Sequence, residues 1–204
     1  MGFETILFDF DGVLCKDRFY ASTLLPEHEE VSDWIQKNVF SKGGSHNELV
    51  RPWMKGERTS DDINRVISEN TGIKYEDLKS LYEESIRQMR LDENVLMLAK
   101  ELKEKGIKIG IVTDNMDVFS QITVPHKKLT GLFNVIVNSA DYGKLKNENE
   151  GELFDIALRA LDEKIGSSLM IDDAERTIEL YWKKGGRGFL YKDFIELQTF
   201  LKDF

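Results

Sequence analysis

The chain of 204 residues contains a single cysteine, Cys15, and only three prolines. One cysteine excludes an intrachain disulfide, so we expect the protein to work in the reducing cytoplasm. No stretch reaches the roughly 18 consecutive apolar residues of a membrane-spanning helix. The first ten residues also lack the basic region and long apolar core of a secretory signal. These absences predict a soluble cytoplasmic protein without a membrane partner.

Positive charge is also scarce. The 28 Lys and Arg residues face 37 Asp and Glu residues, which gives a formal net charge of -9. The sequence contains none of the clustered cations that neutralise a nucleic-acid backbone, so we expect no nucleic-acid partner. A small phosphorylated compound remains compatible with this charge if a metal ion supplies positive charge locally. Nothing in the sequence indicates an oligomeric state.

What the sequence does contain is a regular alternation of apolar patterns. Five short apolar runs predict buried strands, and periods of three and four residues between the later runs predict helices. This order is typical of an α/β fold with a Rossmann-like parallel sheet covered on both faces. The predicted strands span 5–10, 108–113, 133–138, 168–171 and 188–191, and the helices span 94–105, 152–163 and 174–184.

The interval 16–92 breaks this alternation, because it is long, polar and helical in period. Thr59, followed by Ser60, Asp61 and Asp62, has the composition of a helix start, and 75–89 predicts another amphipathic helix. The sequence therefore predicts an α/β core of residues 1–15 and 93–204, with a helical cap domain of residues 16–92 inserted into it.

Two carboxylates, Asp9 and Asp11, stand where the first predicted strand ends. In an extended strand their side chains share a face, and a turn at Gly12 lets both converge on one ligand. Open α/β sheets bind ligands at the carboxyl ends of their strands. Taken alone, the pair is equally compatible with a strand end that simply begins a turn.

Polar residues also follow two later strands. Thr113, Asp114 and Asn115 end the second strand, where a hydroxyl and backbone N–H groups suit a phosphate oxygen. Asp172 and Asp173 end the fourth strand, and adjacent buried acids repel each other unless a cation such as Mg²⁺ lies beside them. An ordinary helix start after the second strand remains the alternative for the threonine.

Lys144 and Lys146 lie in the loop between the third and fourth strands. One ammonium there would balance a phosphate and the acidic residues, although a solvated lysine explains either position equally well.

The motifs DFDGV, IVTDN and MIDD, in this order, resemble those of the haloacid dehalogenase-like hydrolase superfamily, in its phosphatase branch with a helical cap. The resemblance implies that Asp9 attacks phosphorus and becomes an aspartyl-phosphate, while Asp11 acts as general acid and base. It also implies that Thr113 and the following N–H groups hold phosphoryl oxygens and that Lys146 offsets charge in the transition state.

The resemblance further implies a bound Mg²⁺. Its ligands would be a carboxylate oxygen of Asp9, the backbone carbonyl of Asp11 and the carboxylate of Asp173, with Asp172 beside them.

The lysine motif departs from the family pattern, which commonly reads Lys-Pro-Asp-Pro before a helix that begins with Phe. The sequence after Lys146 lacks both prolines and is longer by about two residues. Counting forward from residues 139–143 favours Lys146 over Lys144, whereas counting back from Phe154 favours neither.

In the resembled family, residues of the cap select the leaving group. Arg51, Trp53 and Lys55 are the candidates here, together with Asp114 and Asn115 beside the threonine. The alternative is that Trp53 belongs to the core of the cap and that the charges are solvated.

These observations predict a magnesium-dependent phosphomonoester hydrolase that acts on a small phosphorylated metabolite, which we expect to be a sugar phosphate. A sugar-phosphate mutase and a catalytically silent binding module on the same fold are the alternatives. A carbon–halogen dehalogenase is less favoured, because it needs neither Asp11 nor the pair Asp172 and Asp173.

Overall fold

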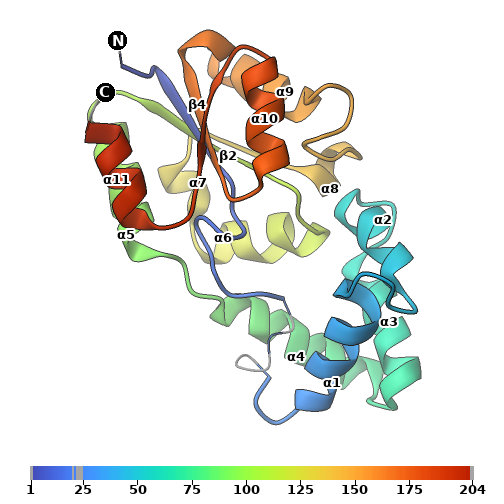
Figure 1. Cartoon of the computed structure of the whole chain (residues 1–204). Helices are drawn as coiled ribbons and strands as arrows, with labels where there is room; N and C mark the ends of the chain where they lie inside the picture. Colours follow the sequence, from blue (N-terminus) through green and yellow to red (C-terminus); the bar gives the residue numbers. More distant parts are fainter. Residues whose placement is uncertain (1, 20, 22–24, 203–204) are drawn as a thin grey trace.

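A computed structural model describes residues 2–19, 21 and 25–202 (Figure 1). Its centre is a five-stranded parallel sheet in the order β3-β2-β1-β4-β5, which confirms the predicted α/β fold class. The strands are β1 (Thr5–Phe8), β2 (Lys108–Thr113), β3 (Val135–Asn138), β4 (Ser168–Asp172) and β5 (Arg187–Leu190).

The position of β1 decides where a site can form. Phe8, the last residue of β1, is paired with Ile111 of β2 and with Ile171 of β4. Parallel strands in this register end at the same edge of the sheet, so the residues that follow all three strands lie beside one another.

Helices cover both faces of the sheet because alternate strand residues point to opposite sides (Figure 1). On one face, Leu7 and Met170 pack against α9 (Glu152–Leu161) and α10 (Glu175–Lys183). The other face packs against α5 (Glu93–Glu104), α7 (Leu129–Leu132) and α11 (Phe194–Lys202). The helices α5, α9 and α10 begin within one residue of the predicted positions and end within two.

Between β1 and α5 lies a group of helices that we call the helical insertion. The predicted helix starts in it are confirmed: Thr59 caps α3 and forms a capping box with Asp62, and another helix begins at Tyr75. The helices of this group are α1 (Glu29–Ile35), the π-helical turn Gln36–Phe40, the short 3-10 turn Asn47–Leu49, α2 (Val50–Met54), α3 (Ser60–Thr71) and α4 (Tyr75–Gln88).

Shorter turns complete the chain: α6 (Val124–His126), α8 (Ser139–Tyr142), the π-helical turn Phe119–Thr123 and the 3-10 turn Ile165–Ser167. In the part of the chain that the structure describes, no helix has both the length and the apolar character needed to span a membrane.

The two connections between the sheet and the helical insertion run side by side. Cys15 forms an antiparallel bridge with Leu91, and the amide of Asp92 donates to the carbonyl of Leu14 at 2.8 Å. This pairing coincides with the boundaries predicted near residues 15 and 92. The division into a core and an independent cap domain stays a prediction.

Asp117, in the helical turn that follows β2, binds the helical insertion to the core. Its carboxylate accepts from the backbone N–H of Ser60 at 3.0 Å and from the indole Nε1 of Trp53 at 3.3 Å. Ser60 begins α3, so Asp117 supplies an acceptor to N–H groups that a helix start leaves without a partner. Ser60 and Trp53 are both buried, so the backbone N–H and the hydroxyl of Ser60 depend on this carboxylate as their acceptor.

Replacing Asp117 with alanine is expected to lower the free energy of unfolding by about 1–3 kcal/mol, because it leaves buried donors without an acceptor. Urea denaturation followed by circular dichroism measures the change. Asp33→Ala, at an exposed position of α1, is the matched control. An equal change in the two variants would contradict the fastening role.

Candidate active site

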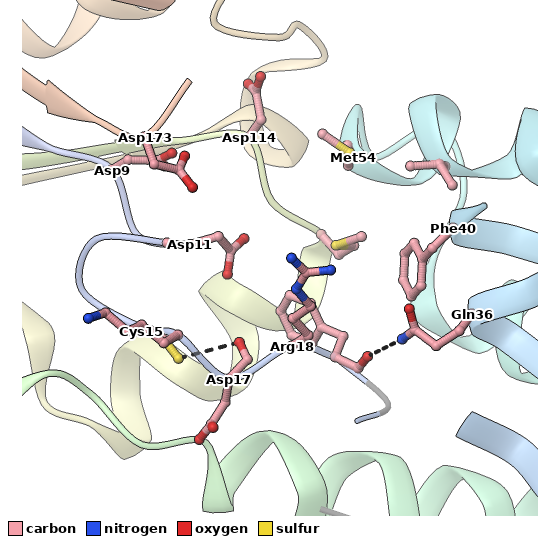
Figure 2. Close-up of a pocket in the computed structure, with 15 residues that line it drawn as sticks. Asp9, Asp11, Cys15, Asp17, Arg18, Gln36, Phe40, Met54, Asp114 and Asp173 are labelled. Atoms are coloured by element: carbon pink, nitrogen blue, oxygen red, sulfur yellow. Dashed lines mark hydrogen bonds between the residues drawn. The ribbon is translucent and has the colours of Figure 1, made fainter. Parts of the chain in front are cut away.

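A cavity of about 550 Å³ opens between the carboxyl edge of the sheet and the helical insertion (Figure 2). Its walls come from the loop after β1, from the ends of β2 and β4, and from the insertion. The lining residues are Asp9, Asp11, Gly12, Cys15, Lys16, Asp17, Arg18, Phe19, Gln36, Phe40, Val50, Met54, Asp114, Met116 and Asp173.

Asp9 stands at the point where β1 leaves the sheet. Its backbone N–H still donates to the carbonyl of Ile171 at 2.9 Å, but the next N–H, that of Phe10, donates to the Oδ1 of Asp9 itself at 2.8 Å. This local bond replaces a backbone bond to the neighbouring strand, so β1 ends at Phe8 and not at residue 10 as predicted. The turn therefore begins before Gly12, and Asp11 already belongs to it.

Lys146 lies against the acids. Its Nζ is 2.7 Å from Oδ2 of Asp9 and 2.6 Å from Oδ2 of Asp172, and the lysine is only 4% exposed. Its backbone N–H donates to Oδ1 of Asp114 at 2.7 Å, which holds the loop at the end of β2. Lys144 instead pairs with Glu152 at 2.7 Å. Of the two lysines that the sequence left open, the structure places Lys146 beside the acids.

The two acids after β4 have different environments. Asp172 is fully buried, and its oxygens accept from the N–H of Ala174 at 2.8 Å and from Lys146 at 2.6 Å. Asp173 lines the cavity. Gly12 makes room for it, because a Cβ at that position would overlap the carboxylate of Asp173. This geometry favours Asp173 as the acid that meets a ligand.

Asn115 orients Asp11. Its Nδ2 donates to Oδ2 of Asp11 at 2.9 Å, and its backbone N–H donates to Oγ of Ser139 at 2.9 Å. Asn115 is fully buried, so it acts on the cavity through Asp11. Among the residues expected to bind substrate, Asp114 lines the cavity and Asn115 does not.

Thr113 is the last residue of β2 and is fully buried. Its hydroxyl has no hydrogen-bond partner in the described part of the chain. Buried hydroxyls are normally paired. The unpaired hydroxyl of Thr113, at the end of a strand, is therefore suited to a hydrogen bond with an oxygen of a ligand.

Burial dominates the electrostatics of the acids. It raises the pKa of the Asp9 carboxyl to about 8 and that of Asp11 to about 7, although the charge of Lys146 opposes both shifts. Burial also disfavours the charged form of Lys146, but the carboxylates of Asp9 and Asp172 outweigh it, and the net pKa lies above the usual lysine value. Fully ionised acids here need more positive charge than Lys146 supplies.

The residues predicted in the helical insertion do not line the cavity. Trp53 is fully buried, and its ring lies beside those of Phe40 and Tyr82. Its indole N–H donates to Ser60 and Asp117, so the polar atom of the ring is paired inside the fold. The structure therefore places Trp53 in the apolar core and not in the cavity wall.

The side chains of Arg51 and Lys55 contact the loop that carries Lys146 and do not line the cavity. Both form ion pairs with Glu148, at 3.6 Å in the case of Lys55. Glu148 also accepts from the backbone N–H of Leu145 at 3.0 Å, so one carboxylate joins the helical insertion to the loop that carries Lys146.

Sequence reasoning missed Glu148 and Arg18. Arg18 lines the cavity, and its charge lowers the pKa of both Asp11 and Asp173 against the effect of their burial (Figure 2). Arg18 is only seven residues after Asp11, and this short distance in the sequence could have indicated that it lies near the cavity. Glu148 had no signal, since its partners come from α2.

Cys15 also lines the cavity, but burial raises the pKa of its thiol to about 12. The thiol is therefore protonated at neutral pH and is a poor nucleophile.

The acids fit a hard divalent cation. Asp9, Asp172 and Asp173 each place a carboxylate oxygen within 4.8 Å of the others. An all-oxygen set of this kind is what Mg²⁺ prefers. Burial raises the pKa of Asp9 and of Asp173, so a cation beside them would stabilise their ionised forms.

A parallel sheet that gathers acids, a threonine and a lysine beside one cavity at its carboxyl edge defines an α/β enzyme. Residues 3–179 match the model of the haloacid dehalogenase-like hydrolases, and the chain belongs to this family. Pyrophosphatase PpaX of Bacillus mycoides (strain KBAB4) is 24% identical over 206 residues, which cover 93% of this chain and 89% of that protein.

Solved structures share the fold at lower identity. A haloacid dehalogenase family enzyme from Bacteroides thetaiotaomicron, in complex with magnesium and inorganic phosphate, has a TM-score of 0.68 at 16% identity and covers 96% of this chain and 99% of its own. A predicted hydrolase of the same family from Porphyromonas gingivalis has a TM-score of 0.73 at 14% identity and covers 99% and 98%.

Replacing Lys146 with alanine is expected to lower kcat by about 100-fold or more, because it removes a buried cation from the reacting group. Phosphate release from an aryl phosphate measures the loss, and circular dichroism checks that the variant folds. Lys144→Ala is the matched control and is expected to keep nearly full activity. Equal losses in the two variants would contradict the assignment of Lys146.

Proposed function

We propose that the protein is a magnesium-dependent phosphomonoester hydrolase that acts on a small phosphorylated metabolite through an aspartyl-phosphate. The observation that carries this proposal is the contact of Lys146 with both Asp9 and Asp172, beside a cavity that Asp11 and Asp173 also line. The family membership, the pyrophosphatase relative and the phosphate bound by a protein of the same fold support it.

In the first step, a carboxylate oxygen of Asp9 attacks phosphorus, and the bond from phosphorus to the ester oxygen breaks. The electron pair of that bond goes to the leaving oxygen, which takes a proton from Asp11. A pKa of about 7 makes Asp11 suited to this transfer at neutral pH. Its hydrogen bond from Asn115 fixes the direction of the carboxyl group.

In the second step, Asp11 takes a proton from water, whose oxygen attacks the phosphorus of the aspartyl-phosphate. The bond from phosphorus to Asp9 breaks, which releases phosphate and restores the carboxylate. Lys146 offsets the charge that gathers on the phosphoryl oxygens in both steps, and the hydroxyl of Thr113 donates to one of them.

Asp9, the backbone carbonyl of Asp11, Asp173 and the adjacent Asp172 are the residues that would hold Mg²⁺. When bound, the ion supplies positive charge to the phosphoryl oxygens and to the crowded acids.

The helical insertion serves as a cap in this proposal. It contributes Gln36, Phe40, Val50 and Met54 to the cavity wall, so it contacts whatever is attached to the phosphate. A closed cap keeps water away during the first step. The single cysteine supports a cytoplasmic location.

Hydrolysis of inorganic pyrophosphate is a second candidate, favoured by the likeness to pyrophosphatase PpaX. It uses the same residues, with phosphate in place of an alcohol as the leaving group. A mutase would also use them but would return the phosphoryl group to its substrate, so assays must follow isomers as well as free phosphate.

Replacing Asp9 with asparagine is expected to lower the release of phosphate from p-nitrophenyl phosphate by about 10⁴-fold or more, the scale on which loss of a covalent nucleophile acts. Asp33→Asn, on the exposed face of α1, is the control and is expected to be fully active. Turnover in the Asp9 variant close to that of the control would exclude the aspartyl-phosphate.

Magnesium is expected to raise the melting temperature, because an ion that binds only the folded state stabilises it by mass action. Differential scanning fluorimetry with and without MgCl₂ measures the shift. The shift should shrink strongly in Asp173→Asn and stay unchanged in Asp33→Asn. A shift of the same size in both variants would show that the ion binds elsewhere.

A further inference from the structure

The cavity has two chemically different halves. The half at the sheet edge carries Asp9, Asp11, Asp114 and Asp173. The opposite half is formed by the helical insertion and is mainly apolar: Phe40, Val50 and Met54 lie there with Gln36, and Phe19 and Met116 are further apolar side chains of the cavity wall. Figure 2 shows Phe40 and Met54 on the insertion side, across the cavity from the acids.

The cavity is larger than the phosphoryl group needs. A water-sized group takes up roughly 30 Å³ in a liquid, so the five heavy atoms of a phosphate fill well under half of about 550 Å³. The remaining space is where the carrier of the phosphate lies, and that carrier meets the apolar half.

An apolar wall discriminates between carriers. A sugar would turn several hydroxyls toward Phe40 and Met54, and each hydroxyl that gives up water without a new partner costs free energy. A leaving phosphate would place charge against the same wall. A flat apolar ring gains instead, because it buries apolar area against an aromatic face and adaptable methionines.

Arg18 gives the cavity a cation between its two halves (Figure 2). On one side, the charge of its guanidinium lowers the pKa of Asp11 and Asp173 against the effect of their burial. Gln36 lines the wall on the other side and donates to the carbonyl of Phe19 at 3.4 Å. The polar edge of a ring has partners here while the faces of the ring meet the apolar side chains.

We infer that the substrate is a phosphate monoester whose carrier is an aromatic or heteroaromatic ring compound, in place of the sugar phosphate that the sequence predicted. This inference rests on the proposed phosphomonoesterase function. Met54 is a specificity-determining residue in this reading, because its side chain lines the cavity whereas its backbone carbonyl is held by Ser139 at 2.6 Å.

The test compares 2-phenylethyl phosphate with glucose 6-phosphate and pyrophosphate, all with MgCl₂, by phosphate release. The first two are both esters of primary alcohols, so their leaving groups have similar reactivity and the carrier alone differs. We expect kcat/KM for 2-phenylethyl phosphate to exceed that for glucose 6-phosphate at least tenfold. A preference of that size for glucose 6-phosphate or pyrophosphate would overturn the inference and leave the hydrolase intact.

Met54→Gln keeps the length of the side chain but makes it polar. We expect it to raise KM for 2-phenylethyl phosphate about tenfold and to lower KM for glucose 6-phosphate, because the amide gives the hydroxyls of the sugar a hydrogen-bond partner. Met97→Gln, at a methionine of α5 that is 56% exposed, is the matched control. Equal effects of both variants on both esters would remove Met54 from the recognition of the carrier.

A binding measurement separates the inference from the proposed function. 3-Phenylpropylphosphonate has the shape of the phenylethyl ester but cannot be hydrolysed. Calorimetry with MgCl₂ should show it to bind at least tenfold more tightly than methylphosphonate, and Met54→Gln should remove the difference. If this binding is found and no ester is hydrolysed, the preference of the cavity for an aromatic carrier stands and the proposed hydrolase function fails. Equal binding of the two phosphonates would overturn the inference.

Discussion

The crowding of carboxylates at the carboxyl edge of a buried sheet is the constraint on which the rest of the structure depends. Asp9 follows β1 and Asp172 is the last residue of the neighbouring strand β4. Both are buried, so their negative charges repel across a short distance. Lys146 is the cation that contacts both of them. The loop that carries it is held by Asp114 on one side and, through Glu148, by the helical insertion on the other.

Local patterns in the sequence predicted the sheet and the polar ends of its strands, because apolar runs, capping residues and acid pairs are properties of neighbouring residues. A bond from Phe10 to the side chain of Asp9 shortens β1. Local patterns cannot show contacts between residues that lie far apart in the sequence. The indole N–H of Trp53 donates to Asp117, which is 64 residues away in the sequence, and the Trp53 side chain is buried in the core. Glu148 depends on Arg51 of α2 and on Lys55 just after it, and no spacing along the chain can show these contacts.

The helical insertion and the sheet share one apolar cluster, which runs from Ile6 to Trp53 and Tyr82. Polar contacts reinforce this joint at Asp117 and at Ser139, whose hydroxyl donates to the carbonyl of Met54. Any opening of the cavity along this line breaks buried hydrogen bonds and exposes apolar area, both of which cost free energy. The insertion side of the cavity wall is therefore held in place before a ligand arrives.

The central place of β1 has a further consequence for the way this chain is made. β1 is synthesised before the other four strands of the described sheet, yet its partners begin at Lys108 and Ser168. Its apolar residues must remain unpaired until most of the chain has left the ribosome, and contacts so far apart in sequence form slowly. The helices of the insertion, which depend on nearer contacts, can form in the meantime. The segment proposed to recognise the carrier is thus free to assemble before the segment proposed to cleave its phosphate ester.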